Sequence, residues 1–578
     1  MTSNQSNKKT ATQICIIILS ILGLMICIPV LFPPVRQMIV DLAGRILHRE
    51  IYPGWIKTSL SYAMGVICFI LFFDYCTLTR SGKLLTHKVK QEIKDCLSEI
   101  DFRSLLKPVL IMSGVYLLGI VTIIRANFSY IDDIGRATEG YREWHAWSRY
   151  ISELSSIFIH GDTNLTDISP LPQLLAILIL SISSVLLVYI IGNKKITVVR
   201  LLASIPLGLS PYFLECLSYK FDAPYMALSI LASIVPFLFI TRKKAFFFCS
   251  VASLLIMCMT YQAASGIYPM IVLLLCFRDW NSRKKPNKEI LSFMGMAAGT
   301  FCFAILCFKI FLVKPVPDYF YGSNTIFPIH QIIPGTLSNI KGYVMIINQD
   351  LGTIWKVGIA LVLFFFIIQS IHQSAQKQIS SFFVIILIIG LSFIASYGVY
   401  SVFPTLWYLP RTLFGFGLFL AILCIFVVSD YKKIATITVL ALNWCLFVFA
   451  FSYGNALADQ ARYAEFRMGM LLHDLSSLYP DQNREDVTLQ IKNSIDYAPS
   501  VKNIAKHYPV IERLVPKLLE GDTDWGFYYF SLRFKSILFD PKSLDARNDD
   551  VSHLPVVLDS YYHTIQSDGE RILVLLKH

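Results

Sequence analysis

The chain has 578 residues, of which 55% are hydrophobic and 16% are charged. Soluble chains carry about 25% charged residues, so this composition excludes an ordinary soluble protein and indicates a membrane protein. The formal net charge is +12, but the basic residues flank apolar runs as short clusters, which argues against nucleic-acid binding. The cysteines show no zinc-like spacing. None follows Cys445, so the C-terminal tail is expected to fold without disulfides.

Apolar runs long enough to cross a bilayer recur along the chain. Runs of about 17 to 25 apolar residues predict about thirteen spans, and thus an all-α polytopic membrane protein. The expected spans are residues 13–32, 58–78, 106–124, 171–191, 197–214, 224–241, 245–260, 263–277, 290–313, 356–372, 381–402, 411–429 and 434–452. The first run is too long for a signal-peptide core, so we interpret it as a retained anchor.

Basic clusters between the spans give the orientation, because cytoplasmic loops carry an excess of Lys and Arg. The clusters assigned to the cytoplasm are Lys8-Lys9, the amphipathic segment 79–105, Lys194-Lys195, Arg242 to Lys244, Arg283 to Lys285 and Lys432-Lys433. Residues 33–57 are also basic but fall on the opposite side. We interpret them as an amphipathic helix in the membrane interface.

The opposite, external side receives the longer loops and the tail. These are the loop 125–170, a short loop around Tyr219 to Asp222, the loop 314–355, the turn 403–411 and the tail. The tail shows a helical period over 455–477, short apolar runs from Val487 and Ile572, and a helical stretch over 510–519 broken at Pro516. Sites concentrate on loops held by a rigid scaffold, so any chemistry is expected here.

The predicted organisation has three parts. Residues 1–105 form an N-terminal two-span region that ends in the cytoplasmic amphipathic segment. Residues 106–452 form the main transmembrane domain, with the external loop 125–170 in which any catalytic site is expected, and residues 453–578 form a small C-terminal α+β domain.

The stretch 130–144 begins where the span 106–124 leaves the bilayer. It opens with two adjacent carboxylates, Asp132 and Asp133, and Arg136 lies one helical turn further on. Charges at this position are costly unless they pair or function. A carboxylate can act as a general base toward a hydroxyl, and a neighbouring carboxylate can raise its pKa. The alternative is a charged turn that only ends the membrane helix.

External arginines are the candidates for binding a phosphate, because a guanidinium forms bidentate hydrogen bonds with phosphate oxygens. They are Arg136, Arg149 and Arg411. For Arg411, the alternative role is an interfacial anchor beside Trp407 and Tyr408.

Four further residues have both a binding and a structural interpretation. Asp222 is either a second acidic group in the site or the N-cap of the helix that begins near Pro224. Gln262 could bind a sugar hydroxyl or join two helices. Trp144 and Trp147 could stack on a sugar ring or anchor the loop at the interface.

Motifs of several enzyme classes are missing from the sequence. It has no phosphate-binding glycine loop, no Gly-x-Ser-x-Gly elbow and no His-Glu-x-x-His motif. A transporter of lipid-linked glycans remains compatible with the sequence, although the spans carry almost no central charge apart from Asp74. A lumenal glycosyltransferase with sequons at Asn127 and Asn164 is a further interpretation, as is a binding protein that works through its tail.

The run Asp132-Asp133-Ile-Gly-Arg136, followed by Glu139, Trp144 and Arg149, resembles the start of the bacterial type II glucosyltransferases. These serotype-converting enzymes add glucose to O-antigen. The resemblance extends to stretches at 221–228, 261–263, 410–413 and 508–516, so it covers about residues 106–578. The order of these motifs and their common side are more specific than any one of them.

The resemblance implies a GT-C-like helical bundle with a periplasmic C-terminal domain, embedded in the bacterial inner membrane. It implies a polyprenyl-phosphate-linked sugar as donor, usually glucose, and lipid-linked O-antigen as acceptor at the periplasmic face. By position, Asp133 or Asp132 would be the base of an inverting single displacement. Arg411 would bind the lipid phosphate, and Glu139 would belong to the substrate-binding set.

No cofactor is expected. Two adjacent aspartates could ligate a divalent cation, but the external side shows no cluster of histidines and carboxylates. The expected partners are the lipid-linked donor, the O-antigen acceptor and the bilayer, with no nucleic acid.

Overall fold

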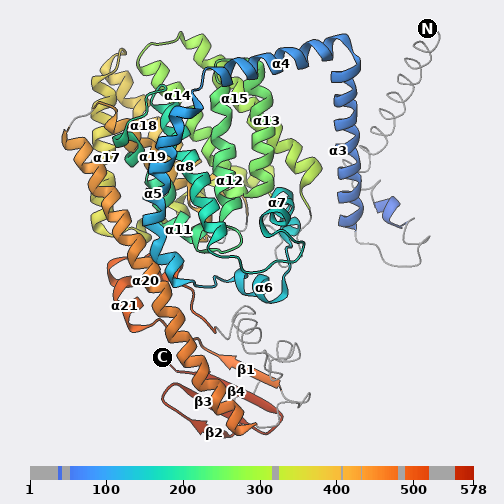
Figure 1. Cartoon of the computed structure of the whole chain (residues 1–578), viewed down its shortest axis with the longest axis vertical. Coiled ribbons are helices and arrows are strands. Elements are labelled where there is room, and N and C mark those ends of the chain that lie inside the picture. The colour runs from blue at the N-terminus through green and yellow to red at the C-terminus, as the bar shows by residue number, and fades with distance from the viewer. Residues whose placement is uncertain are drawn as a thin grey trace.

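The computed structural model describes residues 37–41, 53–314, 325–404, 408–430, 433–479, 488–519 and 553–577. The predicted first span, most of the segment 33–57 and Trp407 lie outside the described residues. The described chain is a bundle of helices with one small β-sheet at its lower end (Figure 1).

Within the described residues, nine helices are long and apolar enough to cross a membrane. Each coincides with one of the predicted spans. They comprise α3 (Pro53–Leu78), α5 (Phe102–Ala126), α8 (Leu171–Ile191), α13 (Lys243–Thr260), η3 with α14 (Gln262–Gly266, Ile267–Asn281), α15 with the π-turn η4 (Asn287–Cys307, Phe308–Leu312), α17 (Thr353–His372), α18 (Gln378–Ala395) and α20 (Lys433–Leu478).

The prediction of about thirteen spans is not confirmed. The run 197–214 is broken: Val198–Leu209 and Pro211–Ser218 meet at 63°, because Pro211, at the start of α11 (Pro211–Ser218), donates no backbone hydrogen bond to the preceding helix. The runs 224–241 and 411–429 form shorter helices, Ala223–Phe239 and Gly415–Val427. The described residues therefore hold nine candidate spans, or ten if the bent pair counts as one.

The central helix α19 (Gly415–Val427) explains part of this difference, since every one of its residues is buried. It is apolar because protein surrounds it, and an apolar run alone does not distinguish protein contact from lipid contact. The helices α5 and α20 pack closely against each other. A Cβ placed on Gly454 of α20 would lie 2.5 Å from the Thr122 carbonyl carbon and 2.6 Å from the Ile123 nitrogen.

The remaining elements are short or lie at the ends of the bundle. They are α4 (Arg80–Ser98), α6 (Asp132–Glu139), η1 (Trp144–Trp147), α7 (Tyr150–His160), α9 (Val198–Ala203), α10 (Pro206–Leu209), α11 (Pro211–Ser218), α12 (Ala223–Ile234), η2 (Val235–Phe239), η6 (Ile329–Gln331), α16 (Ile332–Asp350), η7 (Gly398–Val402), η8 (Pro410–Thr412) and η9 (Val428–Asp430).

The two ends of the bundle differ in charge and content. At the upper end in Figure 1, the basic helix α4 contacts two of the predicted cytoplasmic turns. Lys194 Nζ lies 2.9 Å from Glu99 Oε2, and the Ala245 N–H donates to Glu92 Oε2 at 3.0 Å. The acidic helix α6 and the tail lie at the opposite end. The basic helix α4 and the two turns that it contacts therefore lie at one end of the bundle, and α6 and the tail lie at the other.

The tail is attached through α20, a single helix of 46 residues that contains both the predicted span 434–452 and the predicted helix 455–477. The sheet that follows has the strand order β1-β4-β3-β2, with β1 and β4 parallel and the other pairs antiparallel. Its strands are β1 (Thr488–Lys492), β2 (Val556–Asp559), β3 (His563–Ser567) and β4 (Arg571–Leu576), and the tail helices are α21 (Pro499–His507) and α22 (Ile511–Leu514).

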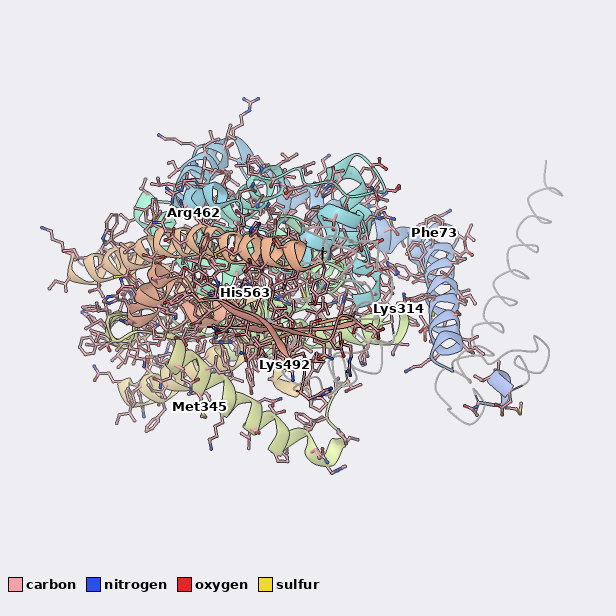
Figure 2. All side chains as sticks on the ribbon, turned by 90° about the horizontal axis from the view of Figure 1, so that it is seen from below. Phe73, Lys314, Met345, Arg462, Lys492 and His563 are labelled. Carbon is pink, nitrogen blue, oxygen red and sulfur yellow. The ribbon has the colours of Figure 1, made fainter. Side chains whose placement is uncertain are left out.

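Two side chains of α20 fasten the sheet. Arg467 Nη2 donates to the carbonyls of Tyr562 and Lys577 at 2.9 and 2.7 Å, and His563 Nε2 lies 3.0 Å from Asp474 Oδ2. Seen from below, His563 and Lys492 lie in front of the bundle, while Phe73 of α3 lies at its edge (Figure 2). The sheet therefore projects from the same end of the bundle as α6.

Candidate active site

The site begins with the short helix α6, which follows α5 after a tight turn. Asn127 ends α5 in the left-handed conformation, and the acidic pair Asp132-Asp133 occupies the first turn of α6. Negative charge is favourable there because the helix N-terminus carries a partial positive charge. Successive helical residues point about 100° apart, so the two carboxylates face different surroundings.

Asp133 faces the protein interior and is fully buried. Its Oδ2 accepts hydrogen bonds from the backbone N–H groups of Tyr130 and Lys220, both at 3.0 Å. Burial raises the pKa of Asp133 well above its ordinary value, although the Lys220 N–H opposes this shift. This carboxylate therefore fastens α6 to the loop that precedes α12.

Asp132 is only half-buried. Burial raises the pKa of Asp132, whereas the charges of Arg411, Arg136 and Arg149 lower it. These are the three external arginines predicted from the sequence. Asp132 is thus the carboxylate of the pair that shares its surroundings with them.

Arg136 is held by Asp222 and Trp144. Its Nη2 lies 3.6 Å from Asp222 Oδ2, and its guanidinium carbon lies 3.9 Å from the centre of the Trp144 ring. Trp144 Nε1 donates to Asp222 Oδ1 at 2.5 Å. Asp222 precedes α12 but makes no side-chain capping hydrogen bond. Its carboxylate therefore orients Arg136 and Trp144 rather than capping the helix.

Arg411 lies in η8, directly against α11. Its Nη1 is 3.3 Å from Glu215 Oε1 and also donates to the Tyr219 hydroxyl. Its backbone N–H donates to Glu215 Oε2. Glu215 is buried, so the guanidinium is oriented by a carboxylate beneath it. An interfacial anchor would not need this partner.

Arg149 and Gln262 join the start of α7 to η3. Arg149 Nε donates to Gln262 Oε1 at 3.5 Å, and its guanidinium carbon lies 4.6 Å from the centre of the Tyr261 ring. Gln262 Nε2 donates to the Trp147 carbonyl at 3.2 Å. The amide of Gln262 therefore joins two helical segments, as its structural interpretation predicts.

The structure brings most of the predicted site residues together. Trp144 is buried, with Arg136 over its ring and Tyr225 at 5.2 Å, so its ring is not open to stack on a sugar. Trp147 is exposed. Glu139 is exposed at the last residue of α6.

Glu215 is a site residue that was not predicted from the sequence. It lies in α11, one residue beyond the predicted span 197–214, where a carboxylate at the end of an apolar run is itself a signal of function. Lys220 was not predicted as a site residue either. It is a buried lysine whose Nζ lies 3.0 Å from Asp167 Oδ2.

The side chains that could ligate a metal do not form a metal centre in the part of the chain that the structure describes. No group of three His, Cys, Asp or Glu side chains there is placed to hold a metal ion. The arrangement instead combines one half-buried carboxylate with three arginines. This combination can accept a proton and stabilise a phosphate.

The family model described as glucosyl transferase GtrII matches residues 121–454, more than half of the chain. The chain belongs to the GtrII glucosyl transferase family. The match includes every site residue from Asp132 to Arg411 and ends inside α20. Membership identifies a membrane glucosyltransferase and favours this function over a transporter.

A relative of this GtrII-family chain occurs in Salmonella phage P22. It is described as an uncharacterized 55.3 kDa protein in the gtrB 5′ region. The two are 25% identical over 441 residues, which cover 72% of this chain and 88% of the relative. No solved structure matches the chain.

Proposed function

We propose that this GtrII-family protein transfers a glucosyl group from a polyprenyl-phosphate donor to lipid-linked O-antigen at the periplasmic face of the bacterial inner membrane. The observation that carries the proposal is the position of Asp132, in the first turn of α6, within reach of the charges of Arg136, Arg149 and Arg411. A polyprenyl chain would remain in the lipid while its phosphate reaches these arginines. The family match and the predicted sidedness support the proposal, and the GT-C-like bundle that the resemblance implies belongs to it.

The proposed reaction is a single displacement. The acceptor hydroxyl gives its proton to the Asp132 carboxylate, and its oxygen attacks the anomeric carbon of the donor. The bond from this carbon to the phosphate oxygen breaks, and polyprenyl phosphate leaves with its negative charge stabilised by Arg411. The configuration inverts, so NMR of the product should show the opposite anomer to the donor.

The geometry favours Asp132 over Asp133 as the general base. A base must come within hydrogen-bond reach of the proton that it removes. Asp133 is fully buried, and two backbone N–H groups bind one of its oxygens. Asp132 is half-buried and lies among the arginines. We therefore assign Asp133 a positioning role.

The test compares O-antigen composition and linkage in a host strain that expresses wild-type protein, Asp132→Asn or Asp133→Asn. Wild type should add a glucosyl side branch. Asp132→Asn should lose about 10²–10⁴-fold in rate, the usual contribution of a general base. Asp133→Asn should keep most activity, because an amide oxygen can still accept both backbone hydrogen bonds.

Each variant must be present in the membrane at the wild-type level. Asp162→Asn, in the exposed turn before α8, is the matched control and should leave the O-antigen as in wild type. Full activity of Asp132→Asn would contradict the assignment of the base. A wild-type strain that makes the donor and acceptor but shows no new glucose would contradict the proposed function.

A further inference from the structure

The short tail helix α22 contacts the segment that carries the catalytic carboxylate. The Leu514 carbonyl accepts a hydrogen bond from the Tyr130 hydroxyl at 2.6 Å. Tyr130 is buried and lies two residues before Asp132. The Leu514 carbonyl also accepts a bond from Tyr453 of α20 at 3.5 Å. The end of α22 is thereby fixed against both the bundle and the acidic segment.

The same helix contacts the segment that carries Arg411. Arg513 Nη2 donates to the carbonyl of Tyr408, three residues before Arg411. Tyr408 has a φ of 30°, which non-glycine residues rarely adopt. A hydrogen bond from a charged donor is well suited to hold such a backbone.

Arg513 is also connected, through Asp350, to the helix beneath Arg411. Its Nη1 pairs with the carboxylate of Asp350, a buried residue at the end of α16. The same Asp350 oxygen accepts a hydrogen bond from the Tyr212 hydroxyl at 2.9 Å. Tyr212 lies on α11, one turn before Glu215, which orients Arg411. One guanidinium thus connects α22, α16, α11 and the strained backbone at Tyr408.

We propose that Arg513 is a positioning residue that acts through Arg411. In this proposal, α22 fixes the separation between Asp132 and Arg411, because Leu514 binds one segment and Arg513 binds the other. The inference rests on the proposed role of Arg411 in binding the donor phosphate. It gives a function to the tail, which lies beyond the residues matched by the family model.

The test measures the affinity of purified full-length protein for polyprenyl phosphate, the proposed leaving group, in detergent micelles. Arg513→Lys is the main variant. A lysine can still pair with Asp350, but it lacks the planar fork that bonds Asp350 and the Tyr408 carbonyl together. We expect it to fold and to raise the Kd about tenfold, with the KM for the acceptor unchanged.

A double-mutant cycle separates positioning from general damage. If Arg513 acts through Arg411, then Arg513→Lys should change the Kd by less than about twofold in an Arg411→Ala background. A tenfold rise in Kd caused by Arg513→Lys in both the wild-type and the Arg411→Ala background would overturn the inference. A wild-type Kd for the Arg513→Lys single variant would also overturn it. Arg571→Ala is the matched control, since Arg571 pairs with Asp568 in an exposed turn of the same tail.

The binding readout also distinguishes failure of the inference from failure of the proposed function. If wild type transfers glucose but Arg513→Lys binds polyprenyl phosphate normally, only the positioning role fails. If wild type binds polyprenyl phosphate and the cycle shows coupling, but no glucose is transferred, only the proposed function fails. If wild type does not bind polyprenyl phosphate, both are contradicted.

Discussion

Asp132 and Asp133 are chemically identical neighbours that their surroundings make different. Asp133 is closed in by backbone N–H groups from its own turn and from Lys220, 87 residues away in the chain. Asp132 is left beside the arginines. The sequence identified the pair as the catalytic candidates, but it could not choose between them, because the partner that closes in Asp133 comes from a distant loop.

The pH dependence of the proposed reaction should report Asp132, the proposed general base. Its carboxylate must be ionised to accept a proton, and burial raises its pKa above the ordinary value of 3.8. The acidic limb of kcat/KM should therefore lie above pH 3.8, with activity lost as the pH falls through the raised pKa. Because the charge of Arg149 lowers this pKa, Arg149→Gln should move the limb to higher pH.

The measurement is kcat/KM for the donor across pH in wild type, Arg149→Gln and Arg142→Gln. Arg142, which precedes η1 and pairs with Glu153 of α7, is the control, so the acidic limb of the Arg142→Gln profile should match that of wild type. If the acidic limb of the kcat/KM profile moves to lower pH in Arg149→Gln, another group acts as the base.

Other residues show the same limit of sequence reasoning. The sequence alone is compatible with Trp144 as a sugar-stacking residue or an interfacial anchor, yet in the structure its ring supports Arg136 and its N–H binds Asp222. Residue type and spacing suggested that these residues belong to one site. Their pairings depend on contacts between α6, η1 and the loop before α12, which no local pattern contains.

Among the elements, the nine long helices were predictable because each is a continuous apolar run. The broken and short helices were not. Pro206 and Pro211 begin new helices within one apolar run, and α19 is enclosed by protein. A hydropathy pattern measures the preference for an apolar environment, so it cannot tell whether lipid or protein provides it.

The contact between α5 and α20 should depend on Gly454. An alanine there would place its Cβ against the Thr122 and Ile123 backbone, which cannot move as a side chain can. We expect Gly454→Ala to destabilise the bundle by about 1–3 kcal/mol, the usual cost of overpacking. Thermal unfolding of the purified protein in detergent measures this change.

Gly469→Ala on the same helix is the matched control. A Cβ at Gly469 meets no atom within 4 Å, and alanine favours a helix over glycine by about 1 kcal/mol. The control should therefore unfold at or above the wild-type temperature. Equal stability of the two variants would show that α5 and α20 do not pack closely at Gly454.

At the scale of the whole molecule, the tail sheet depends on α20 for its position. Arg467 is buried and donates to the carbonyls of Tyr562, just before the inner strand β3, and Lys577, just after the inner strand β4. Hydrogen bonds from a charged donor contribute about 1.5–3 kcal/mol each. Arg467→Ala should therefore release the sheet and leave the membrane bundle folded.

Limited proteolysis of the purified protein measures this release. Cleavage after α20 should be faster in Arg467→Ala than in wild type, while the bundle fragment stays intact. The control is Arg462→Ala, because Arg462 lies on the same helix and pairs with Asp459 in an exposed position. Equal cleavage of both variants would show that Arg467 does not fasten the sheet.

The length of the uninterrupted helix α20 also fixes how far the tail sheet lies from the membrane. Its 46 residues correspond to about 70 Å at about 1.5 Å per residue, whereas the hydrocarbon core is about 30 Å thick. More than half of the helix length is thus in excess of that needed to cross the lipid. Since α20 is one uninterrupted helix, the number of residues between its membrane part and Arg467 fixes two properties of the sheet. Each residue adds a rise of about 1.5 Å and a rotation of about 100°, so this number sets both the distance of the sheet from the bilayer and the direction in which it faces around the helix axis.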